Sequence, residues 1–127
     1  MSIAGRRAIL LVEDDPLLRE MLGELLRYEG YQVFEAADGG AAIAALAERR
    51  PPPASLGLVI LDMMLPVADG VQVLAALAGW GSFVPVVAVS ADGHQLRRAA
   101  DAGADATLPK PYDLDQLLAV VARNCDG

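Results

Sequence analysis

The chain has 127 residues, a formal net charge of −7 and an isoelectric point near 4.5. This length fits one domain, and the acidity argues against a basic face that binds nucleic acid. With 54% hydrophobic and 21% charged residues, the composition excludes a disordered chain, so we expect a single domain, 1–127, with its core at about 8–124.

In chain order, the sequence alternates between short apolar strands and amphipathic helices. The strands are predicted at 8–12, 32–36, 58–61, 84–89 and 106–108. The helices are predicted from Pro16 to Gly30 and at 39–49, 70–78, 93–102 and 114–124. The first, third and fourth strands are continuous runs rich in Val, Ile and Leu, which indicates burial on both faces of a sheet.

The ends of the helices carry local signals. An aspartate precedes each helix as a candidate N-cap: Asp15, Asp38, Asp69, Asp92 and Asp113. Asp113 also forms a capping-box pattern with Gln116. Gly30, Gly79 and Gly103 are expected to end three of the helices. In the first helix, apolar residues at 17, 18, 21, 22, 25 and 26 predict one buried stripe.

The order of the elements predicts an α/β fold, (βα)5, with a doubly wound, five-stranded parallel sheet. Alternating strands and helices give right-handed crossovers. The flavodoxin-like strand order 2-1-3-4-5 is one common solution. It places a switch point between strands 1 and 3, and ligands bind there at the carboxyl ends of the strands.

Chemically active side chains follow four of the predicted strands. Glu13 and Asp14 follow the first strand and Asp62 the third, whereas Ser90 follows the fourth and Lys110 the fifth. Carboxylates that meet at the switch point repel one another. Hard oxygen ligands without His or Cys favour Mg²⁺, with Mn²⁺ or Ca²⁺ as alternatives. A carboxylate beside the metal can accept a phosphoryl group, whose oxygens a lysine and a hydroxyl would bind.

Taken singly, these residues have simpler interpretations. Asp15 is expected to cap a helix, and Asp62 or Ser90 alone could be a turn residue. Lys110 alone could be a solvated surface lysine. Complementary groups at four strand ends favour a common site. The chain has no glycine-rich phosphate loop, and its one histidine cannot support a Ser/His/Asp triad.

Five segments carry a family resemblance: ILLVEDDP at 9–16, LVILDMMLP at 58–66 with Gly70 following, VAVSAD at 87–92, AGAD at 102–105 and LPKPY at 108–112. In this order and spacing, they resemble the response regulator receiver domain (CheY-like) of two-component signalling, over about 8–123. The resemblance implies that Asp62 is phosphorylated. It also implies that Mg²⁺ is bound by Glu13 through water, by Asp14 and Asp62, and by the backbone carbonyl of Met64.

The same resemblance implies roles for the other strand ends. Ser90 would follow the phosphoryl group, Lys110 would pair with it, and the Lys110–Pro111 peptide bond would be cis. A histidine kinase or phosphotransfer protein of a two-component pathway or phosphorelay would donate the phosphoryl group. The receiver would catalyse the transfer and the later hydrolysis. Thr107 stands at the switch position where the family usually has an aromatic residue.

Phosphorylation would change the face formed by the helix at 93–102, the strand at 106–108 and the helix at 114–124. That face would bind a downstream protein or a second copy, without direct contact to nucleic acid or membrane. The apolar run at 117–122 supports such a contact. One alternative is a phosphorylation-independent interaction module with the same fold. Another is a Mg²⁺-dependent phosphohydrolase, although Met64 stands where a second acid would be needed.

The sequence also bears on location. Asp62, Asp69 and Gln72 interrupt the longest apolar stretches, so no segment is expected to span a bilayer. Cys125 is the single cysteine, which excludes a disulfide framework, and its position near the end predicts an exposed, reduced thiol. We expect a cytoplasmic, free-standing domain.

Overall fold

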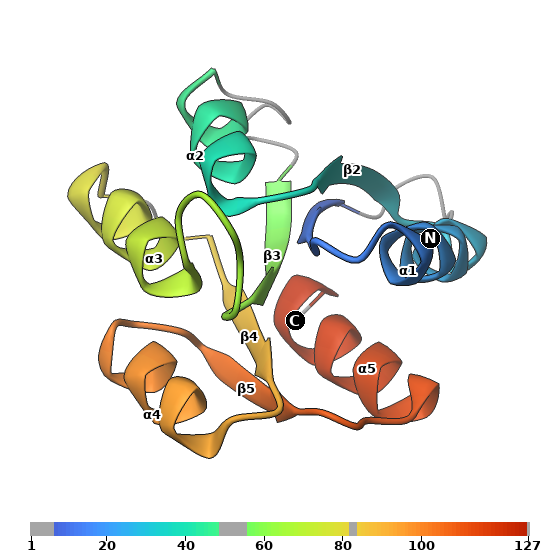
Figure 1. Cartoon of the computed structure of the whole chain (residues 1–127). Coiled ribbons are helices and arrows are strands. Elements are labelled where there is room, and N and C mark those ends of the chain that lie inside the picture. Colours follow the sequence, from blue (N-terminus) through green and yellow to red (C-terminus); the bar gives the residue numbers. More distant parts are fainter. Residues whose placement is uncertain (1–6, 49–55, 82–83, 127) are drawn as a thin grey trace.

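The computed structural model describes residues 7–48, 56–81 and 84–126. Within them, five parallel strands form one sheet in the order β2-β1-β3-β4-β5 (Figure 1). The strands are β1 (Ala8–Val12), β2 (Gln32–Ala36), β3 (Leu56–Asp62), β4 (Val86–Ser90) and β5 (Ala106–Pro109). The predicted fold class and strand order are confirmed.

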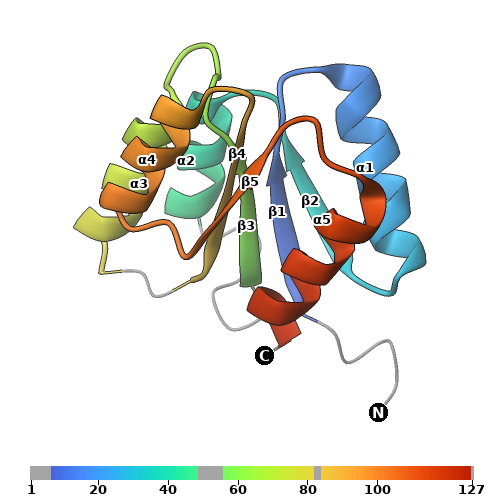
Figure 2. The same cartoon turned by 90° about the horizontal axis from the view of Figure 1, so that it is seen from below.

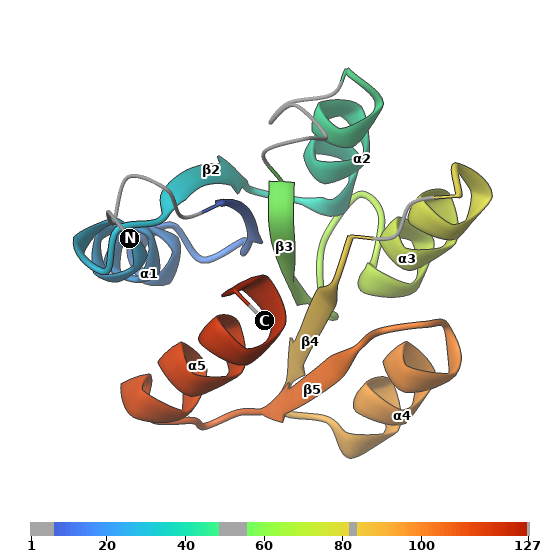
Figure 3. The ribbon, with the colours of Figure 1, turned by 180° about the vertical axis from the view of Figure 1, so that it is seen from behind.

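Helices cover both faces of the sheet. They are α1 (Pro16–Tyr28), α2 (Gly39–Ala47), α3 (Gly70–Gly79), α4 (Gly93–Asp101) and α5 (Leu114–Val121), the last continuing into the π-helix η2 (Ala122–Asp126). Helices α1 and α5 lie on one face, and α2, α3 and α4 lie on the other (Figure 2). The reverse view shows the same two layers (Figure 3). None of the described helices has the length and apolar composition needed to cross a bilayer.

The central strands are buried on both sides, as their continuous apolar runs predict. Every residue of β1, β3 and β4 is buried, whereas the edge strands β2 and β5 contain exposed, half-buried and buried residues. Side chains alternate in direction along a strand, so successive residues of β1 pack into the hydrophobic clusters on opposite faces of the sheet. Ile9 and Leu11 pack with Leu22 of α1, while Leu10 and Val12 pack with the α2 and α3 side. This two-sided burial fixes the register that places the strand ends.

All five predicted N-caps are present. The carboxylates of the capping aspartates accept hydrogen bonds from backbone N–H groups in the first turn of α1 to α5. The predicted capping box of Asp113 is confirmed, and Asp69 forms a second one. Gly30 and Gly103 follow helix ends with φ of 97° and 106°. Gly79 was expected to end α3 but lies within it. Gly81, with φ of 68°, supplies the left-handed residue instead.

Several expectations from sequence are wrong in detail. Leu17 and Met21 are 77% and 48% exposed, so the buried stripe of α1 is narrower than its apolar pattern. The Cys125 thiol is buried rather than exposed, because η2 returns the end of the chain to the core beside β3. The predicted helix at 114–124 is helical throughout, but it changes from the α-helix α5 to the π-helix η2 after Val121 and runs on to Asp126. The residue at 49, the predicted end of the second helix, lies outside the described residues.

Candidate functional site

Two acidic segments meet at the switch point of the sheet. Strand β1 pairs with β3 so that Val12 lies opposite Leu61, and the residues that follow this pair are therefore neighbours. Carboxylate oxygens of Glu13, Asp14 and Asp62 all lie within 4.8 Å of one another. Glu13 and Asp62 are buried, whereas Asp14 is exposed. The parallel register thus joins Asp14 to Asp62, an acid 48 residues further along the sequence.

One cation reaches this acidic cluster from β5. The Nζ of Lys110 donates a hydrogen bond to Oδ2 of Asp62 at 3.2 Å and lies 3.5 Å from Oε1 of Glu13. The backbone N–H of Lys110 donates to the carbonyl of Ser90 at 2.9 Å, which ties the end of β5 to β4. The Lys110–Pro111 peptide bond is cis, as the resemblance implied.

Backbone groups hold the buried carboxylates in place. The N–H of Met64 donates to Oδ1 of Asp62 at 3.0 Å, and the N–H of Asp15 donates to Oε2 of Glu13 at 3.1 Å. Asp62 therefore has one oxygen on a backbone donor and the other on Lys110. These contacts fix the orientation of both carboxyl groups.

The electrostatics of the cluster are unfavourable without a further cation. Burial raises the pKa of Glu13 to about 7; the nearby Asp62 charge adds to the rise, while the backbone donor of Asp15 and Lys110 oppose it. Burial lowers the pKa of Lys110, but the charges of Asp62 and Glu13 outweigh it, so its pKa is above the ordinary value. The ammonium group of Lys110 thus pairs with two of the three clustered acids, Asp62 and Glu13.

The donor set fits a magnesium ion. Three carboxylates converge without His or Cys in the described cluster, and hard oxygen ligands are those that Mg²⁺ prefers. One oxygen of each carboxylate lies within 4.8 Å of the other two, so these three side chains would hold the ion together. Burial is the main cause of the raised pKa of Glu13, and an ion here would also offset the Asp62 charge that adds to the rise.

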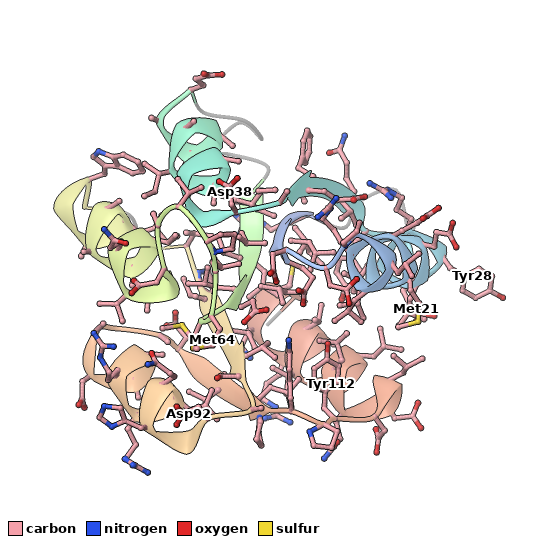
Figure 4. All side chains as sticks on the ribbon, viewed as in Figure 1. Met21, Tyr28, Asp38, Met64, Asp92 and Tyr112 are labelled. Carbon is pink, nitrogen blue, oxygen red and sulfur yellow. The ribbon has the colours of Figure 1, made fainter. Side chains whose placement is uncertain are left out.

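The remaining predicted residues occupy different positions. Ser90 is buried at the end of β4, next to β3, and its Oγ accepts a hydrogen bond from the N–H of Asp92. Met64 follows β3 and is exposed (Figure 4), and its backbone donor already contacts Asp62. Thr107 is exposed on β5, opposite Ala88, and belongs to the strand rather than to the acidic cluster.

Two neighbours of the site were not anticipated from sequence. Arg19 of α1 donates from Nη1 to the carbonyl of Glu13 at 2.8 Å. Tyr112, half-buried beyond the cis peptide, has a raised pKa because of burial and the charges of Glu13 and Asp62, which outweigh Lys110. The proximity of Arg19 to the site could have been suspected from the sequence, because Arg19 lies four residues, or about one helical turn, after the N-cap Asp15.

Comparisons with known proteins agree with this geometry. The family model described as response regulator receiver domain matches residues 9–122. Response regulator MprA of Mycobacterium tuberculosis (strain ATCC 25618 / H37Rv) is 41% identical over 113 residues, which cover 87% of this chain and 47% of that protein. The chain thus spans about half the length of the curated relatives it matches.

Solved structures give the same result. The receiver domain of NtrX from Brucella abortus is 30% identical, with a TM-score of 0.80, and the match covers 93% of this chain and 98% of that one. A chain of the CheX-CheY-BeF3-Mg²⁺ complex from Borrelia burgdorferi is 25% identical, with a TM-score of 0.81. That match covers 92% of this chain and 87% of the other.

Proposed function

The chain belongs to the response regulator receiver family of two-component signalling, and from this premise we propose that Asp62 is its phosphoryl acceptor. The observation that carries the proposal is the convergence of Glu13, Asp14 and Asp62 within 4.8 Å, with Lys110 at 3.2 Å from Asp62. Under this proposal, Glu13, Asp14, Asp62 and the carbonyl of Met64 hold Mg²⁺. The Mg²⁺ in the similar complex from Borrelia burgdorferi supports this assignment.

The transfer step follows from how Asp62 is held. A carboxylate oxygen of Asp62 attacks the phosphorus, and the bond from phosphorus to the donor nitrogen breaks with its electron pair going to the imidazole. Mg²⁺, when bound, neutralises negative charge on the phosphoryl oxygens. Lys110 neutralises a further part of that charge from the other side, and the N–H of Met64 keeps the aspartate oriented. The chain contributes mainly positioning and electrostatic stabilisation.

Ser90 is proposed to detect the new group. Its hydroxyl accepts from Asp92 in this structure and keeps a hydrogen free to donate to a phosphoryl oxygen. Phosphorylation adds about −1.5 to −2 charges, which gives that donor a strong partner. The change then passes through Thr107 of β5 to the face of α4, β5 and α5, where a downstream protein or a second copy binds. Later hydrolysis, also catalysed by the receiver, resets the switch.

The phosphoryl donor is proposed to be a histidine kinase or phosphotransfer protein that docks beside the site, in the cytoplasm. Met21 of α1 and Leu114 of α5 are exposed apolar residues that line a hollow together with Lys110, and Leu17 is exposed on the same helix as Met21. Figure 4 shows Met21 on the side of α1 that is nearest to α5. Met21→Glu is expected to slow transfer from a phosphohistidine protein. It should leave uptake from acetyl phosphate unchanged, because the small donor does not need this surface.

The direct test uses acetyl phosphate and the intact mass of the protein. With Mg²⁺, wild type should gain one phosphoryl group, whereas Asp62→Asn should gain none. With a chelator, uptake should be lost, since the acidic cluster would lack the cation. Asp69→Asn is a matched control because this residue caps α3 and lies outside the cluster. Wild type that takes up no phosphate with Mg²⁺ would favour the phosphorylation-independent module. Turnover of a small phosphoester would favour a phosphohydrolase.

A further inference from the structure

The guanidinium group of Arg19 contacts the turn that contains Glu13 and Asp14. Nη1 of Arg19 donates to the carbonyl oxygen of Glu13 at 2.8 Å. We infer that Arg19 is a positioning residue for the metal: it fixes the peptide group between Glu13 and Asp14 so that both carboxylates face Asp62. This inference rests on the proposed function and assigns a role to a residue outside the acidic cluster.

A single peptide plane connects the two acids. The carbonyl of Glu13 and the N–H of Asp14 belong to the same planar group, so a bond to the carbonyl also limits the direction in which Asp14 leaves the strand. The N–H of Glu13 donates to the carbonyl of Ala36, which holds the other side of the residue. The hydrogen bond from Arg19 therefore restrains the peptide group on the side of Asp14, the exposed acid of the cluster.

Arg19 is itself anchored on β2. Its Nε lies 3.5 Å from Oε1 of Glu35, and Nη2 of Arg27 lies 2.9 Å from Oε2 of the same carboxylate. Arg27 also donates to the carbonyl of Val33 at 2.9 Å. Glu35 thus bridges two arginines of α1, and the side chain of Arg19 is only 21% exposed. An anchored arginine loses less entropy when it holds the turn than a free one would.

A glycine makes room for this bridge. Residues 19, 23 and 27 are spaced by four and share one face of α1. A Cβ on Gly23 would lie 2.9 Å from Oε2 of Glu35 and 3.1 Å from Nη1 of Arg27. The helix therefore leaves the space over Gly23 to the carboxylate that links the two guanidinium groups, although glycine is a poor helix former.

Charge and positioning predict opposite effects when Arg19 is removed. If only charge mattered, the three carboxylates would attract Mg²⁺ more strongly once the positive charge of Arg19 is removed. Loss of the hydrogen bond to Glu13 would instead let the acidic turn move and weaken binding. Arg27 is the matched control, because it has the same charge and the same partner Glu35 but does not contact the acidic turn.

The experiment is a Mg²⁺ titration of the whole chain, followed by the ¹⁵N–¹H NMR signals of Glu13 and Asp14. Wild type, Arg19→Met and Arg27→Met are compared, and the dispersion of the other signals shows that each variant is folded. Arg19→Met should raise the Kd for Mg²⁺ by about tenfold, the lower end of the effect of losing an outer-shell partner. Arg27→Met should change it by less than about twofold, because its contacts are remote from the metal.

The outcomes separate the inference from the proposed function. Wild type without a saturable shift at Glu13 and Asp14 would overturn the magnesium site, and the inference with it. Wild-type binding with an unchanged or lower Kd in Arg19→Met would overturn the inference alone, as would equal weakening in both variants. If Arg19→Met does not fold, Arg19→Lys replaces it. One ammonium cannot hold both Glu13 and Glu35 as the guanidinium does, so wild-type affinity in that variant would also overturn the inference.

Discussion

Acidic residues follow the strands of this sheet in two different environments. The five capping aspartates direct their carboxylates at backbone N–H groups at the start of helices. Glu13, Asp14 and Asp62 direct theirs at one another, with Lys110 as their cation. Asp14 and Asp15 are adjacent in sequence, yet one belongs to the cluster and the other caps α1.

Structural and functional acids at one edge of a sheet therefore differ in what their carboxylates contact. A helix start supplies partial positive charge and unpaired donors, so a carboxylate there stabilises the fold. Carboxylates gathered around a single lysine repel one another, so they cost stability until a cation arrives. The capping aspartates should therefore stabilise the fold with or without metal. The acidic cluster should instead be needed for binding Mg²⁺ and for accepting the phosphoryl group.

The largest expected effect is stabilisation by Mg²⁺. At a hundredfold excess over its Kd, Mg²⁺ should raise the free energy of unfolding by about 2.7 kcal/mol. The Asp14→Ala and Asp62→Ala variants should lose most of this increase. In chelator, both should be as stable as wild type or more stable, because each removes a repelling charge. Urea unfolding of the three proteins measures this, and clear destabilisation of either variant in chelator would contradict the comparison.

The second effect is a pH dependence of the metal-free protein. The pKa of Glu13 is about 7 in the folded chain, against an ordinary value of 4.5 for a glutamate. Between these values the folded state binds more protons than the unfolded state, so the free energy of unfolding falls as pH rises. Glu13→Gln should reduce this slope between pH 5 and 7, because the group that titrates there is gone. Unfolding in chelator across this range tests it, and equal slopes for the two proteins would show that Glu13 is not responsible.

The smallest effect concerns a cap. Asp113→Ala removes the carboxylate that accepts from the N–H of Gln116 at 2.7 Å, and it should lower the free energy of unfolding by about 1 kcal/mol. The loss should be the same with Mg²⁺ and with chelator. Asp115→Ala is the matched control, because it lies in the same first turn but not at the cap. If the loss of unfolding free energy in Asp113→Ala depends on Mg²⁺, the distinction between capping aspartates and the acidic cluster is wrong.

Much of the fold could be predicted because its signals are local. Continuous apolar runs identify buried strands, and an aspartate before each helix marks where the helix begins. The errors arise where packing decides. Leu17 is apolar but lies beyond the stripe that the sheet can cover, and Cys125 is buried by the late turn of η2. Gly79 and Gly81 are equally suited to a helix end, and only the folded chain selects the second.

The acidic cluster could be predicted because parallel strands bring their carboxyl ends to one edge. The contacts that hold the acidic turn in place could not be predicted from the sequence. The contact from Arg19 to Glu13 depends on the rotamer of a long side chain and on an ion pair with Glu35 across two elements. Nothing in the spacing of residues states that Gly23 leaves room for that pair.

The central claim is that residue 62, rather than another acid of the cluster, takes the phosphoryl group. The most direct measurement is borohydride reduction after treatment with acetyl phosphate and Mg²⁺, followed by peptide mass spectrometry. Reduction converts an aspartyl phosphate to homoserine. We expect homoserine at position 62 and an intact aspartate at position 14. Homoserine at position 14, or at no position in a folded protein that binds Mg²⁺, would contradict it.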